Sequence, residues 1–333
     1  MTDSLVADFY RRFAECEARG QSRIYEEWAL GVADDREVLA LIGALPGMKK
    51  QPNLVFAAAR FLGVSEGPYD EFRQWLIEHW DRIRPVILTR ATQTNEAARC
   101  AVLLPVLSRL DGPLALIEVG ASAGLCLYPD RYGYRYEVDG GSVELEPGDG
   151  SSTVTIPCRI DAASVPSRLP DVAWRAGIDL NPIAPDDPDS RAWLRTLVWP
   201  EQEERRRRLD AALTIAAADP AHLVAGDLVA SITDLVAAAP PGAHVVVFHS
   251  AVLVYLDEEH RERFARLMRA MDRVTWISNE GEGVLHRVAE RLPRPSDGRT
   301  VLAVDERPVA FVGPHGQSYE SLGRKEMVQR SEE

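Results

Sequence analysis

The chain has 333 residues, of which 46% are hydrophobic and 27% charged, and this length suits one large domain or two ordinary ones. Asp and Glu number 51 against 38 Lys and Arg, a net charge of −13 that disfavours nucleic acid and anionic membranes as partners. Four cysteines without a C-x-x-C pair, and histidines without H-E-x-x-H, argue against a disulfide framework and a metal site. The start of the chain lacks the basic and apolar regions of a signal peptide, and no run reaches membrane-spanning length, so we expect a soluble cytoplasmic protein.

Residues 1–111 are expected to form a helical N-terminal domain. Leu5, Phe9 and Phe13 recur at helical spacing and predict one apolar face. The last helix of this domain is expected at 97–110, with a kink or an end at Pro105.

From residue 112 the pattern changes to alternating strands and helices, which predicts a second domain over residues 112–323. Parallel βα units that end in an antiparallel hairpin indicate an α/β, Rossmann-like sheet with helices on both faces. Alternating tyrosines and turn clusters at 131–160 predict a small antiparallel β-meander inserted into it. The charged tail, residues 324–333, is expected to fray. The main strands are expected at 114–119, 172–180, 222–225, 243–249 and 274–278, and the hairpin at 300–304 and 308–312.

The stretch from Leu114 to Leu127 joins an apolar strand to a turn of very small residues. Gly120 and Gly124 bracket Ala121, Ser122 and Ala123, and a helix is expected to begin at Leu125. A strand followed by a turn without bulk lets a ligand approach the bare backbone, as nucleotide-type cofactors require. The alternative is a tight strand–helix turn and nothing more.

The ends of the expected strands indicate which cofactor is involved. Glu118, Asp179, Asp227 and Glu280 are acidic, and neither G-x-G-x-x-G nor a P-loop occurs, so phosphate ligands are disfavoured. S-adenosylmethionine has a cationic sulfonium and ribose hydroxyls, which suit carboxylates and close backbone approach.

Gly120-Ala-Ser-Ala-Gly124 also matches the G-x-S-x-G elbow of serine hydrolases. Ser122 would be the nucleophile, with His249 or His315 as the base. This hypothesis ranks third, because 114–119 is the first strand of its region and no H-G-G-G-type oxyanion segment precedes it.

Six segments of the chain carry a resemblance to a known family. They resemble an uncharacterised bacterial family, domain of unknown function 2332, whose name implies no activity. The segments are Gln51–Leu54, Thr92–Glu96, Ile117–Gly124, Gly177–Pro182, Leu197–Gln202 and Phe248–Ser250.

More loosely, residues 114–313 resemble class I S-adenosylmethionine-dependent methyltransferases, with Ser122 in place of the middle glycine of their first motif. The resemblance implies a methyltransferase-type sheet, ribose contact at Asp179 and adenine contact at Asp227. The expected catalytic residues are His249 and Glu280. The expected cofactor contacts are Glu118, Gly120, Ala121, Ser122, Gly124, Asp179, Gly226, Asp227 and Phe248, and the expected substrate contacts are Asn53, Thr94, Asn95, Glu96 and Asn279.

Each of these residues also has a structural interpretation. Asp227 would cap the following helix, Asp179 would make a turn, His249 would be a core histidine, and Asn95 and Glu96 would cap a helix. The leading hypothesis is methyl transfer to a small molecule, with the helical domain as a lid. The second is a catalytically silent methyltransferase-like protein that binds or regulates. The oligomeric state and the methyl acceptor stay open.

Overall fold

The computed structural model describes residues 3–148 and 150–323, and these form two compact units. The first unit contains residues up to Thr94 together with Asp187–Asp210, and the second contains Asn95–Asp186 and the chain from Ala211 onward. The sequence placed the first boundary at residue 111 and assigned 187–210 to the α/β domain, so the two divisions differ at both points. The expected fraying of 324–333 lies outside the described residues.

The first unit is helical, as its apolar periodicity predicts. Its core is aromatic: Trp28 and Phe72 stack with ring centroids 4.1 Å apart, and Phe56 meets both rings edge-on. Leu5 lies exposed, and the buried side of the first helix is formed by Val6, Tyr10 and Phe13. The helices are α1 (Asp3–Phe13), η1 (Ala14–Ala18), α2 (Arg23–Asp34), α3 (Arg36–Gly43), η2 (Gly47–Lys50), α4 (Pro52–Phe61), α5 (Tyr69–Glu78), α6 (Trp80–Thr89), α8 (Pro188–Leu197) and the first half of α9 (Glu203–Ala218).

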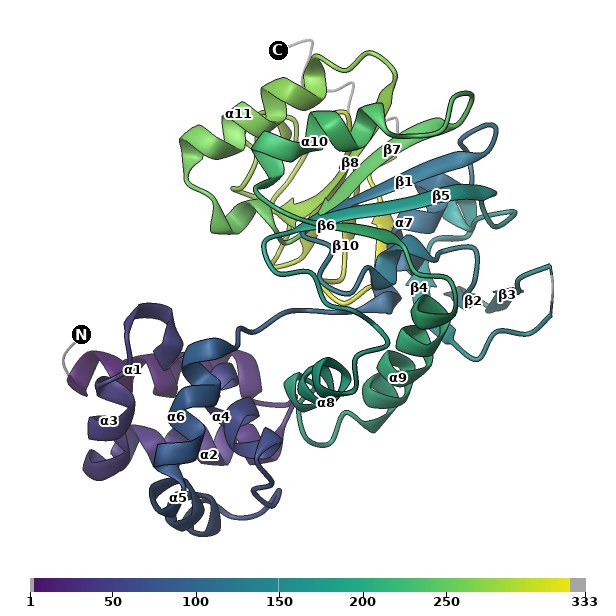
Figure 1. Cartoon of the computed structure of the whole chain (residues 1–333). Helices are drawn as coiled ribbons and strands as arrows, with labels where there is room; N and C mark the ends of the chain where they lie inside the picture. Colours follow the sequence, from purple (N-terminus) through teal and green to yellow (C-terminus); the bar gives the residue numbers. More distant parts are fainter. Residues whose placement is uncertain (1–2, 149, 324–333) are drawn as a thin grey trace. The chain divides into compact units, whose positions relative to one another are not determined.

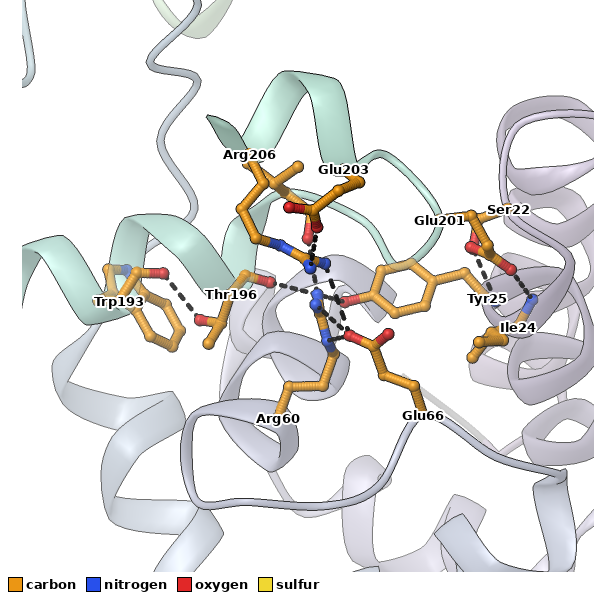
Figure 2. Close-up of polar contacts among 11 residues, drawn as sticks. Ser22, Ile24, Tyr25, Arg60, Glu66, Trp193, Thr196, Glu201, Glu203 and Arg206 are labelled. Atoms are coloured by element: carbon orange, nitrogen blue, oxygen red, sulfur yellow. Dashed lines mark hydrogen bonds and ion pairs between the residues drawn. The ribbon is translucent and has the colours of Figure 1, made fainter. Parts of the chain in front are cut away.

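Polar contacts hold the segment after α8 to the rest of the first unit (Figure 2). Arg60 donates to the carbonyls of Thr196 and Val198 at 2.8 and 2.7 Å. Glu201, with a positive φ of 34°, accepts from the amide of Ile24 at 3.0 Å at the start of α2. The Leu197–Gln202 segment, which contributes to the family resemblance, therefore has a structural role in this unit.

The strands of the second unit form one mixed, mostly parallel sheet, in the order β3-β2-β4-β11-β10-β9-β8-β7-β1-β5-β6. The block β8-β7-β1-β5-β6 is parallel throughout, and β9, β10 and β11 follow it antiparallel to one another. The strands are β1 (Leu114–Val119), β2 (Gly133–Val138), β3 (Gly141–Leu145), β4 (Thr155–Ile160), β5 (Val172–Asp179), β6 (His222–Ala225), β7 (His244–Ser250), β8 (Val274–Gly281), β9 (Thr300–Val304), β10 (Arg307–Val312) and β11 (Ser318–Ser321).

Helices cover both faces of this sheet, as expected (Figure 1). All six residues of β1 are buried, which is typical of a central parallel strand. Ile117 and Val119 share a core with α10 (Leu228–Ala237), α11 (Glu258–Arg269) and α12 (His286–Ala289). The alternate residues Leu116 and Glu118 point to the opposite face, which carries η3 (Ala97–Arg99) and α7 (Cys100–Leu107).

The expected C-terminal hairpin is confirmed. β9 and β10 pair antiparallel, and the turn between them uses Asp305 and Glu306 at positive φ values of 48° and 62°. Positive φ at both central residues gives the turn a twist that matches the flanking strands.

The meander prediction for 131–160 is confirmed for the antiparallel pair β2 and β3 and wrong for β4. β2 pairs antiparallel with β3 on one side but parallel with β4 on the other, and β4 continues the main sheet through β11. The alternation of Ile156, Cys158 and Ile160, all buried, correctly identifies a strand. Alternation does not encode which strand becomes the neighbour or in which direction it runs.

The helix expected at Leu125 is also wrong, because only a three-residue 3-10 turn, η4 (Leu125–Leu127), follows the loop. Pro129 explains this result. A proline disfavours helical backbone at the preceding residue, and Tyr128 indeed has non-helical φ and ψ of −117° and 42°. Among the described residues, no helix combines the length and the apolar character that crossing a bilayer demands.

Candidate functional site

The strand order reverses at β1, which has β5 on one side and β7 on the other. In open α/β sheets, ligands bind beyond the carboxyl ends of the strands at such a switch point. The loop Gly120–Gly124 leaves β1 at this point, and most of the expected site residues lie around it.

The loop Gly120–Gly124 is closed by bonds within the second unit. Each of its five backbone amides donates to an acceptor of the chain, so an incoming phosphate would have to break one of these bonds to be bound. The acceptors are the Ile178 carbonyl for Gly120 (2.8 Å) and Ala121 (3.1 Å), Asp179 Oδ2 for Ser122 (2.8 Å), Asn95 Oδ1 for Ala123 (2.9 Å) and the Ala121 carbonyl for Gly124 (2.7 Å).

Both glycines of the loop are required by packing. A Cβ at Gly120, whose φ is +70°, would stand 2.3 Å from Cγ2 of Val252. A Cβ at Gly124, φ +69°, would stand 3.1 Å from Leu127. The lack of side chains at these two positions therefore serves contacts of the chain with itself.

Asp179 closes β5 and is half-buried at the switch point. Its Oδ2 accepts from the amide of Ser122 and its Oδ1 from the amide of Asn181, each at 2.8 Å. Each carboxylate oxygen has a further lone pair, so this oriented group can still accept from a hydroxyl. The next residue, Leu180, is apolar but 71% exposed. Leu180 was not predicted as a site residue, although a large apolar residue directly after an acid at a strand end could have indicated an exposed apolar surface.

Gly226 and Asp227 lie at the end of β6. The amide of Gly226 donates to the Asp179 carbonyl at 2.9 Å, which ties the ends of β5 and β6 together. Asp227 is exposed, and its Oδ1 caps α10 by accepting from the amide of Ala230 at 3.0 Å. The capping role is therefore present, and the second carboxylate oxygen leaves room for another contact.

His249 is fully buried on the face covered by α11, where its ring packs edge-on against Phe264. Its Nε2 accepts from the indole N–H of Trp276 at 3.0 Å, and its Nδ1 lies 2.7 Å from Glu280 Oε1. An indole N–H only donates, so the ring proton belongs on Nδ1 and is donated to Glu280. Because both nitrogens are engaged inside the core, His249 is not positioned to take a proton from a substrate.

Glu280 anchors the turn that follows β7. Its Oε1 accepts from His249 and also from the amides of Val252 and Leu253, at 2.9 and 3.0 Å. Burial by itself would raise the pKa of Glu280, but the His249 bond and the two amides outweigh it and lower the pKa below the usual range. The carboxylate therefore stays ionised and holds the turn against the sheet.

A second polar group lies on the opposite face of the same strand ends. Arg99, 9% exposed, donates from Nη1 to the Ser250 carbonyl at 3.3 Å and from Nε to the Pro314 carbonyl at 3.1 Å. Asn279, 2% exposed, donates from Nδ2 to Ser250 Oγ at 3.3 Å. Within the described residues, Asn279 Oδ1 is buried without a hydrogen-bond partner, and Arg99 makes no ion pair with a carboxylate. We call Arg99, Ser250 and Asn279 the Ser250 cluster.

Glu118 lies on the same face as the Ser250 cluster, beside Phe248 of β7 in the strand register. Burial raises the pKa of its carboxyl well above the usual range, and Cys126 adds to this, while Arg99 acts in the opposite direction. Its Oε2 is buried and has no hydrogen-bond partner among the residues that the structure describes. Glu118 is therefore a buried acid whose charged form is disfavoured by its surroundings.

The expected substrate residues fall in different units. Asn95 and Glu96 belong to the second unit, where Asn95 Nδ2 donates to Ser122 Oγ at 2.8 Å and Glu96 caps η3 through the amide of Ala98. Asn53 and Thr94 belong to the first unit. Asn279 lies in the second unit, in the Ser250 cluster.

Ser122 lacks the partner that a serine nucleophile requires. Its hydroxyl is hydrogen-bonded to Asn95, and both nitrogens of His249 are used elsewhere. His315 is exposed in the loop between β10 and β11, and no described histidine is hydrogen-bonded to Ser122. The geometry thus gives no support to the hydrolase hypothesis. In residues 3–148 and 150–323, no group of three or more His, Cys, Asp or Glu side chains could hold a metal ion.

Residues 7–320 match the model of a family described as an uncharacterized protein conserved in bacteria (DUF2332), and the chain therefore belongs to this family. No curated protein and no solved structure matches the chain.

Proposed function

We propose that this protein binds S-adenosylmethionine at the carboxyl ends of β1, β5 and β6 and transfers its methyl group to a small molecule. The observation that carries the proposal is Asp179, a carboxylate held in fixed orientation by two amides at the switch point of a sheet with the doubly wound order β6-β5-β1-β7-β8. An acid at the end of the second strand of such a sheet is the group that holds ribose hydroxyls.

The surroundings of Asp179 favour a nucleoside without phosphates. The five loop amides are engaged, so the loop offers no cradle for a pyrophosphate. Leu180 gives an apolar surface next to the acid, suited to the face of a base, and Asp227 at the adjoining strand end suits an exocyclic amine. These three features together match adenosine better than a nucleotide.

When bound, S-adenosylmethionine would supply a methyl group activated by the positive sulfonium. The role left to the chain is to hold the reacting molecules in line and to exclude water, and such positioning accounts for a large part of the rate of displacement reactions. His249 does not serve as a base in this proposal, because its nitrogens bind Trp276 and Glu280. The acceptor is therefore a group that reacts without losing a proton to His249.

Isothermal titration calorimetry with S-adenosylhomocysteine tests this proposal. We expect Asp179→Asn to weaken binding by about tenfold, since one charge-assisted contact is lost. Asp257→Asn is the control, because Asp257 is another acid that caps a helix, with its Oδ1 bonded to the amide and the ring of His260 in α11. It should change affinity by less than about twofold. Equal affinities of all three proteins, or no binding at millimolar ligand, would refute the assignment.

A second function, a catalytically silent binding protein, is favoured by one specific observation. The space beside Gly120 is filled by Val252 and that beside Gly124 by Leu127, so both glycines serve internal packing. Incubation with radiolabelled S-adenosylmethionine and a bacterial metabolite extract separates the two functions. Transfer of label to an extract component supports catalysis, whereas binding without any transfer supports the silent protein.

A further inference from the structure

The Ser250 cluster has hydrogen-bonding capacity that the chain itself does not use. Arg99 is nine-tenths buried, yet its guanidinium meets only the carbonyls of Ser250 and Pro314 in the described part of the chain. Buried arginines are normally paired with an anion, because taking an unpaired charge out of water is costly. The cluster therefore lacks one negative partner.

The same cluster lacks one hydrogen-bond donor. Asn279 Oδ1 is buried and, in the described residues, accepts from nothing, whereas its Nδ2 is fixed on Ser250 Oγ. Ser250 Oγ, which accepts this bond, also has a second lone pair. A positively charged donor placed here would satisfy the amide oxygen and the hydroxyl together.

Glu118, a buried acid on this face, does not supply the missing charge. No ion pair joins it to Arg99 among the described residues, and burial raises the pKa of its carboxyl, which works against the charged form. A neutral Glu118 also leaves the cluster open to an external carboxylate, which an ionised Glu118 would repel.

We infer that Arg99, Ser250 and Asn279 form a subsite for an α-amino-acid zwitterion, with its carboxylate on Arg99 and its ammonium on Asn279 Oδ1 and Ser250 Oγ. One group of this kind brings both the missing anion and the missing donor. This inference deepens the proposed function, on which it rests: the zwitterion is the amino-acid end of the cofactor or that of an amino-acid acceptor. Ser250 ends β7, the strand beside β1, so the subsite lies at the same edge of the sheet as Asp179.

Three ligands distinguish these sources in calorimetric titrations: S-adenosylhomocysteine, 5′-methylthioadenosine, which lacks the amino-acid end, and L-methionine. Arg99→Met should weaken S-adenosylhomocysteine binding by about tenfold or more and change 5′-methylthioadenosine binding by less than about twofold. Arg99→Lys retains the charge without the planar guanidinium. Its loss of affinity for S-adenosylhomocysteine should therefore lie between about twofold and tenfold. Arg168→Met is the matched control, because Arg168 also bridges two backbone carbonyls, those of Ser108 and Leu110.

Selective loss of S-adenosylhomocysteine binding supports the subsite with the cofactor as its source. Loss of L-methionine binding alone supports it with an amino-acid acceptor as the source. Equal loss for S-adenosylhomocysteine and 5′-methylthioadenosine, or no dependence on Arg99 for any ligand, overturns the inference. Wild-type protein that binds no adenosyl ligand refutes the proposed function, and the L-methionine titration then still decides the subsite.

Discussion

Two polar groups lie on opposite faces of the same strand ends, and they differ in how far the chain satisfies them. His249 and Glu280 point toward α11, while their immediate neighbours Ser250 and Asn279 point toward η3 and α7, because successive side chains of a strand alternate. On the first face, both ring nitrogens of His249 and Oε1 of Glu280 have partners, while Oε2 of Glu280 is buried without a hydrogen-bond partner in the described chain. On the second face, Asn279 Oδ1 likewise lacks a partner within the described chain, and the charge of Arg99 meets two backbone carbonyls and no carboxylate there.

The unpaired charge of Arg99 is the feature that separates the two groups and the reason for proposing a ligand on its face. Native proteins rarely leave buried polar atoms unpaired, and those that remain call for an explanation such as a ligand. Glu280 uses its charge to fix the turn at Val252 and Leu253, and Val252 in turn packs on Gly120. The face toward α11 thus fixes the shape of the loop, and the opposite face is the one that we propose for ligand contact.

The largest effect is expected for Glu280→Ala. Removing the carboxylate leaves the Val252 and Leu253 amides and the ring N–H of His249 without an acceptor, so the free energy of unfolding should fall by about 3–5 kcal/mol. Glu290→Ala is the control, because Glu290 forms an exposed i,i+4 pair with His286. It should lower the free energy of unfolding by less than about 0.5 kcal/mol. Urea denaturation followed by circular dichroism measures both, and similar values would remove the structural role given to Glu280.

Gly120→Ala is expected to have the second largest effect. It should lower the free energy of unfolding by about 2–4 kcal/mol, because a Cβ adds both the strain of a left-handed backbone and a clash with Val252. Gly140→Ala separates the backbone strain from the clash. Gly140 also has a positive φ, of +92°, but open space around it, so it should cost only about 1–2 kcal/mol. Adding Val252→Ala to Gly120→Ala should recover about 1 kcal/mol relative to the sum of the single changes. If the Gly120 and Gly140 variants unfold alike, contact with Val252 is not what requires the glycine.

Asn95→Ala tests how firmly Asn95 holds the loop Gly120–Gly124. The amide of Ala123 and the hydroxyl of Ser122 each lose a partner, so we expect a loss of about 1–2 kcal/mol. Asn53→Ala is the control, since Asn53 Oδ1 is buried without a partner in the described chain and its removal should be neutral or stabilising. Thermal unfolding that ranks the two variants the other way would contradict the role of Asn95.

Glu118→Gln is expected to give the smallest effect, and one with a characteristic dependence on pH. The folded chain raises the pKa of Glu118 through burial, so wild-type stability falls as pH rises from the unfolded pKa of an ordinary glutamate toward the folded one. Glutamine has no such proton, and the variant should gain stability relative to wild type as the pH rises above the pKa of an ordinary glutamate. Urea denaturation at several pH values measures this gain. A difference that stays constant, as expected for exposed Glu144→Gln, would show that the carboxyl of Glu118 is ionised in the folded protein.

Periodicity predicted much of the fold because the strands of the sheet are short apolar runs. β1 and β9 have the bounds expected from the sequence, and the terminal hairpin follows from its turn residues. The partner of β4 and the absence of a helix after Gly124 were missed, since they depend on long-range pairing and on Pro129. The attachment of 187–210 to the first unit depends on Arg60 and Glu201, which are distant in sequence from most of their partners.

The site was predictable only in part. The sequence located acids and amides at strand ends. In a strand buried on both faces, however, the sequence does not reveal which of two neighbours, such as His249 and Ser250, points toward the helices on one face and which toward those on the other. Arg99 was missed, although it is the only charged residue between Glu96 and Arg109 and so stood out in an otherwise apolar segment. A lone charge within such a segment is the signal that could have identified it.

A crystal structure of the protein grown with S-adenosylhomocysteine tests the central claim most directly. The account predicts ribose hydroxyls within hydrogen-bond distance of Asp179 and the ligand carboxylate on Arg99, with the loop Gly120–Gly124 unchanged. Ligand bound away from the ends of β1, β5 and β7, or no ligand at a concentration that saturates known methyltransferases, would contradict it.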